Sequence, residues 1–263
     1  GYEIGEGSRP SRGTNIVNLL QMDSDEKVTA LIKVGADEYD MDDRYLVMVT
    51  RRGVIKRTPL SAYRNVRRMG LIAIGLDDGD ELAWVRQTDG TSELIVATRG
   101  GMAIRFDEQD ARPLSRSARG VRAITLEEGD EVVGMARVRK NGDATVLTVS
   151  ESGLGRRTEV SQYRLQSRGG KGIRNYAQGG VAGVKILDED DDVILISQEG
   201  ILIRMHAADI NVQSRYGSGV RVMRLAESDR VVTVARSERD EENAQAPMEQ
   251  PDEAEPVAES DEE

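Results

Sequence analysis

The chain has 263 residues, a formal net charge of −11, no cysteine and only 3% aromatic residues. The absence of cysteine excludes a disulfide framework, a thiolate zinc site and a cysteine nucleophile, and a single histidine excludes a histidine-based triad or metal cluster. No apolar run approaches the roughly 20 residues that span a bilayer, so we expect a cytoplasmic protein that makes no membrane contact.

The negative charge is confined to the end of the chain. Residues 238–263 contain twelve Asp or Glu and one basic residue, whereas the preceding 237 residues carry 35 acidic and 35 basic groups. The acids, the prolines and the lack of apolar periodicity predict a disordered acidic tail over 238–263, which leaves residues 1–237 as the folded domain. Thirty of the 36 basic residues in the chain are arginine, which favours bidentate phosphate contacts.

Two glycine anchors recur along the folded part. The first is a loop that begins with arginine and ends at a glycine, as in RPSRG, RRMG, RSARG, RGGKG and RYGSG, which end at Gly13, Gly70, Gly120, Gly172 and Gly219. The second is a turn glycine followed four residues later by an arginine, at Gly53, Gly101, Gly153 and Gly200, with spacings of 48, 52 and 47 residues. A period near fifty residues is typical of propeller-like arrays, so the chain is predicted to repeat one folded unit.

Each unit reads as about four short strands with almost no helical periodicity. In chain order these are an apolar segment such as YLVMVT or ELIVAT, a hairpin through the anchor glycine, a third strand such as VRAITL, and a closing strand after an acidic turn such as DDGDE. We expect the hairpin glycine to supply a positive φ or a close approach. The predicted fold is all-β, with units from about residues 45, 92, 144 and 192. Residues 1–44 supply the second half of a further unit, which suggests a piece of a longer protein.

Basic residues lie at equivalent places in every unit, so stacked units would align them as a cationic track along one edge. Charge that protects exposed strand edges from aggregation is the alternative, but edge protection could use either sign and these positions are consistently positive. We predict DNA contacts by Arg9, Arg12, Lys56, Arg57, Arg67, Arg68, Arg105, Arg116, Arg119, Arg156, Arg157, Arg168, Lys171, Arg204 and Arg215. No constellation of side chains suggests a catalytic or metal site.

The most specific string is QSRGGKG, Gln166 to Gly172. It puts two cations on a glycine-rich loop whose amides can point outward to phosphate oxygens. The alternative is a flexible loop whose glycines serve a tight turn. It is not a Walker A loop, because the glycine spacing and the Ser or Thr after Lys are missing.

These motifs together resemble the C-terminal domain of the A subunit of DNA gyrase, over essentially all of residues 1–237. The resemblance implies a β-pinwheel, a disc of four-stranded blades with swapped strands, whose basic rim bends duplex DNA. QSRGGKG resembles that family's box, with matches at Gln166, Arg168, Gly169, Gly170, Lys171 and Gly172 and a departure at Ser167. In the family the box belongs to the first blade, whereas this loop lies in a late blade. We therefore interpret it as a secondary, box-like loop and expect the first blade to be missing.

The resemblance further implies a non-catalytic domain that wraps duplex DNA without reading its sequence. It would serve a nucleoid-associated, heterotetrameric holoenzyme made with the rest of the A subunit, together with the B subunit. ATP-dependent negative supercoiling, with its ATP and magnesium, would belong to other parts of that enzyme, so we expect no cofactor here. The alternatives are the corresponding domain of topoisomerase IV, and a propeller used as a protein-interaction platform, which the scarcity of aromatic residues weakens.

Overall fold

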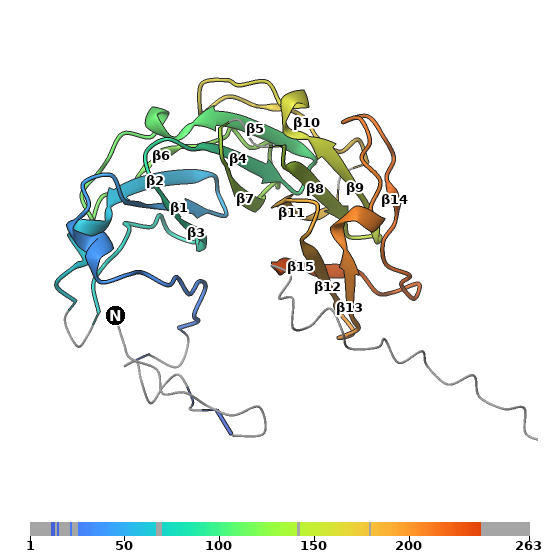
Figure 1. The fold of residues 1–263 in the computed structure, drawn as a ribbon, viewed down its shortest axis with the longest axis horizontal. Helices are drawn as coiled ribbons and strands as arrows, with labels where there is room; N and C mark the ends of the chain where they lie inside the picture. Colours follow the sequence, from blue (N-terminus) through green and yellow to red (C-terminus); the bar gives the residue numbers. More distant parts are fainter. Residues whose placement is uncertain are drawn as a thin grey trace, which may run out of the picture.

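The computed structural model describes residues 12–13, 15, 22, 26–66, 70–140, 143–178 and 180–237. The predicted contacts Arg9, Arg67 and Arg68 and the acidic tail lie outside these residues. No helix among the described residues is long and apolar enough to cross a membrane. The strands confirm the all-β prediction and form four antiparallel sheets, which follow one another around an arc in Figure 1.

Each of the first three sheets has four strands, written here from one edge to the other. Sheet I contains β3 (Leu82–Thr88), β1 (Tyr45–Thr50), β2 (Val54–Pro59) and β6 (Val121–Arg122). Sheet II contains β7 (Val132–Val138), β4 (Glu93–Thr98), β5 (Met102–Asp107) and β10 (Ile173–Arg174). Sheet III contains β11 (Val181–Leu187), β8 (Thr145–Ser150), β9 (Leu154–Glu159) and β14 (Val220–Arg221). Sheet IV has β15 (Val231–Ser237), β12 (Asp192–Ser197) and β13 (Leu202–His206).

The outermost strand of each four-stranded sheet comes from the following unit. The two-residue strand β6 follows the second hairpin in the chain but pairs with β2 of sheet I, through Val54↔Arg122 and Ile55↔Val121. β10 and β14 pair in the same way with β5 and β9. The units that contain these strands therefore supply three strands to their own sheet and a short fourth strand to the sheet before it.

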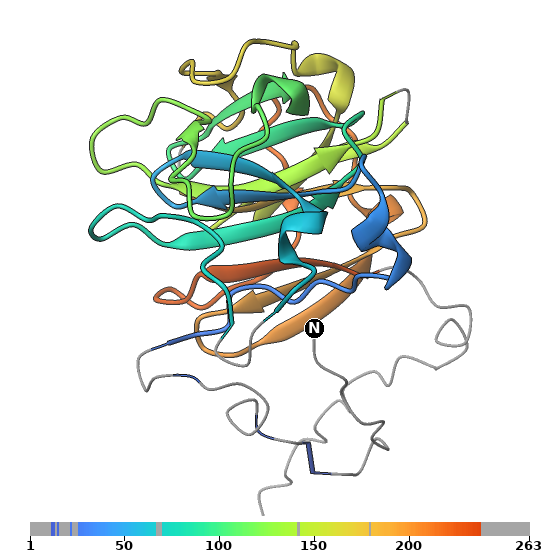
Figure 2. The same ribbon diagram turned by 90° about the vertical axis from the view of Figure 1, so that its left-hand side faces the viewer.

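The strands β3, β7, β11 and β15 lie on the inner side of the arc, and the exchanged strands lie on its outer side (Figure 1). Seen from the side, the sheets are layered one above the next (Figure 2). Apolar side chains of neighbouring sheets pack between them; Val49 and Ile55 of sheet I, for example, join Val96 and Ile104 of sheet II in one core cluster. The middle strands β4 and β8 are buried along their whole length. Short Val, Ile and Ala side chains are sufficient for such thin layers.

One-turn 3₁₀ helices follow the outer hairpin strands of the four sheets. They are η3 (Leu60–Tyr63), η4 (Glu108–Asp110), η5 (Val160–Gln162) and η6 (Ala207–Asp209). A further 3₁₀ helix, η2 (Asp37–Asp40), lies in the segment before β1. Their first residues after the hairpins are Leu60, Glu108, Val160 and Ala207, all of them buried, so the chain turns inward at this point in each unit.

Two places in the described chain lack the exchanged strand. Strand β13 of sheet IV has only β12 as a neighbour among the described residues, and Leu202 on it is 60% exposed. The segment IAIGL, residues 72–76, is the sequence equivalent of the third strand VRAITL and was expected to form one, but it does not. Its equivalents β6, β10 and β14 each need the outer hairpin strand of a preceding sheet, and no such strand precedes sheet I in the described chain. The prediction of a third strand is wrong there because the described chain has no preceding outer hairpin strand with which it could pair.

The two glycine anchors meet each other at each junction between sheets. Gly101, with φ +86°, accepts hydrogen bonds through its carbonyl from the amides of Asn175 and Tyr176 in the next unit, at 2.7 and 2.9 Å. Gly172, with φ +75°, passes so close to the preceding sheet that a Cβ atom would lie 2.3 Å from the Ala103 carbonyl oxygen. The expected positive φ and the expected close approach are therefore both present. Any side chain at either glycine would separate the exchanged strand from its partner.

We expect Gly101→Ala to destabilise the chain much more than Gly200→Ala. Both glycines have positive φ, which costs an alanine about 1–2 kcal/mol. A Cβ at Gly101 would also lie 2.1 Å from the Tyr176 carbonyl oxygen, whereas nothing lies within 4 Å at Gly200. Overpacking adds about 1–3 kcal/mol, so the unfolding free energy should fall by ~3 kcal/mol or more for Gly101→Ala. Urea denaturation measures both losses, and equal losses would contradict this account of the junction.

Candidate nucleic-acid interface

The arginine that follows each hairpin glycine lies at the junction with the next unit. The backbone carbonyls of Arg57, Arg105 and Arg157 accept hydrogen bonds of 2.8–2.9 Å from the amides of Leu114, Gln166 and Gln213, respectively. Each of the three also forms an isolated parallel bridge to the next unit. Strand pairing thus fixes these three arginines where two units meet, which explains why each lies four residues after its hairpin glycine.

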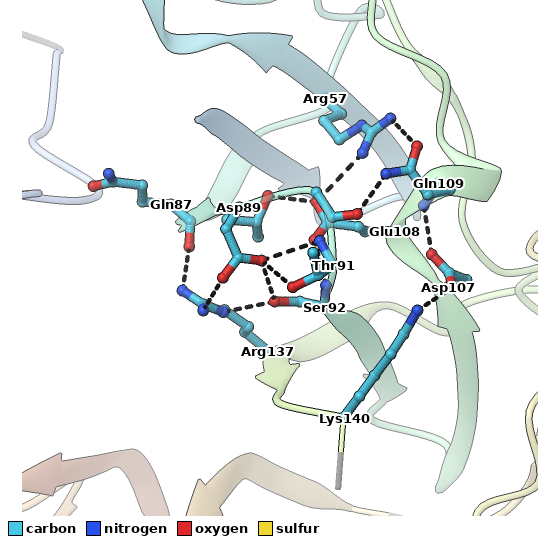
Figure 3. Close-up of polar contacts among 12 residues, drawn as sticks. Arg57, Gln87, Asp89, Thr91, Ser92, Asp107, Glu108, Gln109, Arg137 and Lys140 are labelled. Atoms are coloured by element: carbon cyan, nitrogen blue, oxygen red, sulfur yellow. Dashed lines mark hydrogen bonds and ion pairs between the residues drawn. The ribbon is translucent and has the colours of Figure 1, made fainter. Parts of the chain in front are cut away.

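The Arg57 side chain is enclosed in a polar network between sheets I and II (Figure 3). It is 1% exposed, its Nη1 lies 3.5 Å from Glu108 Oε2, and its Nη2 donates to Gln109 Oε1 at 2.9 Å. The guanidinium carbon also lies 4.5 Å from the centroid of the Tyr45 ring. Glu108 has no exposed surface and accepts a hydrogen bond from the Ser92 amide at 2.7 Å. A buried carboxylate here balances a buried guanidinium, whereas the other sheets place Leu, Val or Ala at the start of the same 3₁₀ helix.

The other three anchor arginines differ in exposure. Arg105 donates to Glu93 in its own sheet at 2.6 Å and to the carbonyls of Val160 and Tyr163 at 2.9 and 3.0 Å. Arg157 is 4% exposed and donates from Nε to the Ile210 carbonyl at 2.8 Å. Arg204 has no following unit in the described chain; its side chain is 42% exposed and pairs with Asp192 at 2.6 Å. The first three guanidiniums therefore bind the next unit, and only Arg204 lies at the surface as we expected for all four.

The basic residues directly before Arg57 and Arg157 are also interior. Lys56 and Arg156 have no exposed surface. Lys56 Nζ donates to the Ala73 carbonyl at 2.6 Å and to that of Arg116, and burial together with the positive charge of Arg116 lowers the pKa of Lys56 to about 8. Arg156 donates to the Arg215 carbonyl at 2.7 Å, and burial lowers its pKa. The structure thus corrects the expected surface position of Lys56, Arg57, Arg156 and Arg157, because the next unit, together with later segments of their own unit, encloses these side chains.

In the loops that end at Gly120, Gly172 and Gly219, the first arginine is half-buried and holds the loop in place. Arg116 donates to the Ile72 carbonyl at 3.0 Å, and Arg168 donates to the carbonyls of Asp110 and Arg122 at 2.8 and 2.9 Å. Arg215 donates to the Gln162 carbonyl at 3.0 Å. Part of each side chain remains at the surface, so these residues hold their loops in place while keeping some contact with solvent.

The box-like loop is bound to sheet II and to the preceding unit through its backbone. The Gly169 amide donates to the Ala123 carbonyl at 2.6 Å, and Gly170 accepts from the Thr125 amide at 2.9 Å. The Gln166 amide donates to the Arg105 carbonyl, and Ser167 is exposed. The glycines thus serve the tight path that we gave as the alternative interpretation. That path leaves the Lys171 side chain 72% exposed and 3.6 Å from Glu127. Phosphate contact by this loop stays a prediction, and Lys171 is the residue that would make the contact.

Arg119 occupies the position in its loop that Lys171 occupies in the next one, and it pairs with Asp77 while its side chain stays 64% exposed. Arg12 is exposed as well. In both Arg119–Asp77 and Lys171–Glu127, a loop cation meets the acidic turn of the unit before it. The acids of these turns are therefore not segregated from the loop cations onto a separate face.

The structure places at the outermost edge three further arginines that are absent from the predicted contacts. Arg122, Arg174 and Arg221 are the second residues of β6, β10 and β14, and all three are exposed. Within the described part of the chain, no carboxylate pairs with their guanidiniums. We call these three residues the rim arginines. The signal that could have identified them is the triplet of glycine, aliphatic residue and arginine that closes each loop: GVR at Gly120, GIR at Gly172 and GVR at Gly219.

A second exposed set follows the 3₁₀ helices. Arg112 and Arg164 come two residues after the ends of η4 and η5, at matching places in their units, and both are exposed. Arg64 occupies the same place beside η3 and pairs with Asp40. The short exchanged strands and the segments beside them thus carry a repeated series of exposed cations. Of the anchor arginines, by contrast, Arg57 and Arg157 are buried and Arg105 is partly buried.

A double-mutant cycle should show that Arg57 and Glu108 act together in holding sheets I and II. Arg57→Met or Glu108→Gln alone leaves one buried charge unpaired, so each should lower the unfolding free energy by about 3 kcal/mol or more. Because the introduced glutamine would still offer an oxygen to the Ser92 amide, the double variant should lose ~1–3 kcal/mol less than the sum of the singles. Urea unfolding of the four chains measures this coupling, and strictly additive losses would contradict it.

Comparisons with known proteins agree with this architecture. The family described as "DNA gyrase C-terminal domain, beta-propeller" matches residues 44–89, 92–139, 144–190 and 191–238. The DNA gyrase A subunit of Haloquadratum walsbyi is 42% identical over 250 residues, which cover 93% of this chain and 29% of that protein. The DNA gyrase A subunit of Staphylococcus aureus is 40% identical over 247 residues, covering 92% and 28%. The chain thus spans less than a third of the length of these relatives.

Two solved structures have the same fold. The C-terminal domain of DNA topoisomerase IV superposes with a TM-score of 0.79 at 25% identity, covering 86% of this chain and 71% of that one. The DNA gyrase A C-terminal domain superposes with a TM-score of 0.73 at 28% identity, covering 85% and 74%. The strand exchange, the two glycine anchors and the four matched segments lead to one conclusion: this chain belongs to the DNA gyrase C-terminal domain family and has its β-pinwheel fold.

Proposed function

We propose that this chain binds duplex DNA along its outer edge without reading the base sequence, and that it bends the duplex around that edge. The observation that carries the proposal is the recurrence of one exposed arginine, free of any carboxylate partner among the described residues, on the exchanged strand of three consecutive sheets: Arg122, Arg174 and Arg221. Phosphate contacts position a duplex but carry no sequence information. A regular series of such contacts therefore suits wrapping better than recognition of one sequence.

Energetics favours contacts from several units in sequence. Bending 20–30 base pairs by 40–90° costs of the order of 1–6 kcal/mol by elastic estimates, so one or two cations would not hold a bent duplex. The rim arginines, the exposed Arg112 and Arg164, and the loop cations Arg119 and Lys171 offer successive contacts along the arc. Arg204 adds one more on sheet IV. Each phosphate neutralised releases counterions, which also makes the binding dependent on salt.

The family and the named relatives support a place in DNA gyrase. We infer that the chain is the part of the A subunit that wraps DNA, and that it has no catalytic site of its own. The rest of that polypeptide, together with the B subunit, would complete a heterotetramer in the bacterial cytoplasm, where ATP and magnesium bound elsewhere drive negative supercoiling. A topoisomerase IV role is the alternative, favoured by the TM-score of 0.79 to that enzyme's domain. The relatives at 40–42% identity are gyrase proteins, which is why we prefer gyrase.

Removing the three rim arginines should weaken DNA binding and reduce its salt dependence. Each phosphate contact contributes about 0.9 to the slope of log K against log salt, so the triple variant Arg122→Ala, Arg174→Ala, Arg221→Ala should lose roughly 3 from that slope. Fluorescence anisotropy with two duplexes of unrelated sequence measures the effect, which should be the same for both. The matched control is the variant Arg51→Ala, Arg99→Ala, Arg230→Ala, which removes the same charge from arginines that line a cavity beside the inner strands and should keep the parental slope. An unchanged slope in the rim variant would contradict the assignment of the rim arginines.

Wrapping should leave a topological trace. If the chain is present while a nicked circular plasmid is ligated, the topoisomer distribution should shift in one direction. The shift should shrink as salt rises, and the rim variant should show a smaller shift than the Arg51→Ala, Arg99→Ala, Arg230→Ala control. Gel electrophoresis of the deproteinised plasmid measures it. Retarded DNA without any shift would mean binding without chiral wrapping and would contradict the second half of the proposal.

A further inference from the structure

The inner strands carry two cations that the repeat does not require. In each sheet one residue of the middle strand pairs with one residue of the inner strand at the same level: Val47↔Arg86, Ile95↔Ala136, Leu147↔Lys185 and Ile194↔Ala235. The alanines in sheets II and IV fill this position without a charge. Packing alone therefore does not explain the charged side chains of Arg86 and Lys185.

Both cations line one cavity on the inner side of the arc, which we call the hub cavity. It has a volume of about 780 Å³ and takes residues from β3, β7, β11 and β15. This volume lies within the ~300–1,000 Å³ typical of small-molecule sites. Its charged lining residues are Arg86, Arg137, Arg139, Lys185, Asp188 and Arg236. Cations thus outnumber acids in its wall five to one.

The carboxylates nearby are engaged with only two of these cations. Arg137 pairs with Asp89 at 3.0 Å, and Arg236 pairs with Asp188 and Asp191 at 3.1 and 2.9 Å. Within the described residues, Arg86, Arg139 and Lys185 have no carboxylate partner. Arg86 donates to the Val85 carbonyl of its own strand, at 2.8 Å. Three positive charges in the wall of one cavity therefore have no described carboxylate to balance them.

The lowered pKa of Lys185 shows that its charged form is disfavoured in this cavity. Burial, and then the positive charge of Arg86, lower the pKa of Lys185 to about 8, and burial also lowers the pKa of Arg86. Both causes disfavour the charged forms, so an anion between the two groups would relieve the repulsion and replace the lost hydration. The charged forms of Lys185 and Arg86 are thus more favourable with an anion beside them than without one.

A second cavity beside the first lacks this excess of charge. It has a volume of about 700 Å³ and is also lined by Lys185. Two of its arginines are balanced, however, since Arg51 lies 3.1 Å from Glu81 and Arg99 lies 2.8 Å from Glu151. An anion would therefore be stabilised most on the side of Lys185 that faces Arg86.

We propose that the hub cavity binds a small, multiply charged phosphate anion, held between Lys185 and Arg86 with Arg139 as an additional contact. Arginine offers a planar fork of donors that matches phosphate oxygens, and lysine adds a compact point charge. This site is separate from the outer edge, so it stands or falls independently of duplex binding.

Titration calorimetry with sodium pyrophosphate in phosphate-free buffer at pH 7 tests the proposal. The 263-residue chain should bind the probe, and Lys185→Met or Arg86→Met should each weaken binding about tenfold or more, as expected for a charge-assisted hydrogen bond lost from a partly buried site. The matched control is Arg174→Met, which removes an exposed cation on the outer side and should change the affinity less than about twofold. Absence of binding to the parent chain, or equal affinity in Lys185→Met and the parent, would overturn the proposal.

Two further measurements distinguish a loss of pyrophosphate binding from a folding defect in the variants. Without probe, Lys185→Met should unfold at the same or a higher temperature than the parent at pH 7, because it removes a repulsion. The folded-state pKa of Lys185 lies below its ordinary value of 10.5. Between about pH 8 and 10.5 the unfolded chain therefore binds more protons than the folded chain. As pH rises through that window, the parent should gain stability relative to Lys185→Met. Pyrophosphate binding should weaken over the same rise in the parent. A flat pH response would contradict the role of Lys185.

Discussion

The exchange of a two-residue strand between neighbouring units is the constraint on which the rest of this structure depends. β6, β10 and β14 complete the sheets before their own, and each exchange brings two backbones closer than a Cβ atom allows. Gly101 and Gly172 therefore belong to a single junction, although the sequence places them 71 positions apart. Their regular recurrence reflects contact between units more than any property of one hairpin.

The same junction decides what each repeated cation does. Lys56 and Arg57 are adjacent on β2, so their side chains leave opposite faces of the strand, yet both are buried. The next unit covers Arg57, and the next unit together with the Ala73 segment of the same unit covers Lys56. Their side chains donate hydrogen bonds to backbone carbonyls and to a carboxylate, which would otherwise lack these donors. Substituting the anchor arginines would thus open the junctions, and a loss of DNA binding in such variants would not identify a DNA contact.

Charge in this domain is arranged in three zones with different physical roles. Interior cations join the sheets, exposed cations on the exchanged strands face solvent along the outer side, and a small group on the inner strands has no carboxylate partner in the described part of the chain. The second zone is suited to a duplex because its members are exposed and repeat with the sheets. Lys185 and Arg86 of the third zone are partly buried, so an unpaired charge there costs more than the same charge at the surface.

Local signals in the sequence were enough to predict the period, the hairpins, the all-β class and the two anchors, because glycine at positive φ and short apolar runs act within a few residues. They did not show which cations reach solvent. The burial of Arg57 depends on Glu108 and Gln109 some fifty positions later, and the exposure of Arg122 depends on its place on an exchanged edge strand. The approach of Arg86 to Lys185 across the inner side likewise follows from the curvature of the arc. These features arise only in the folded chain, since each is a contact between units that have nearly the same local sequence.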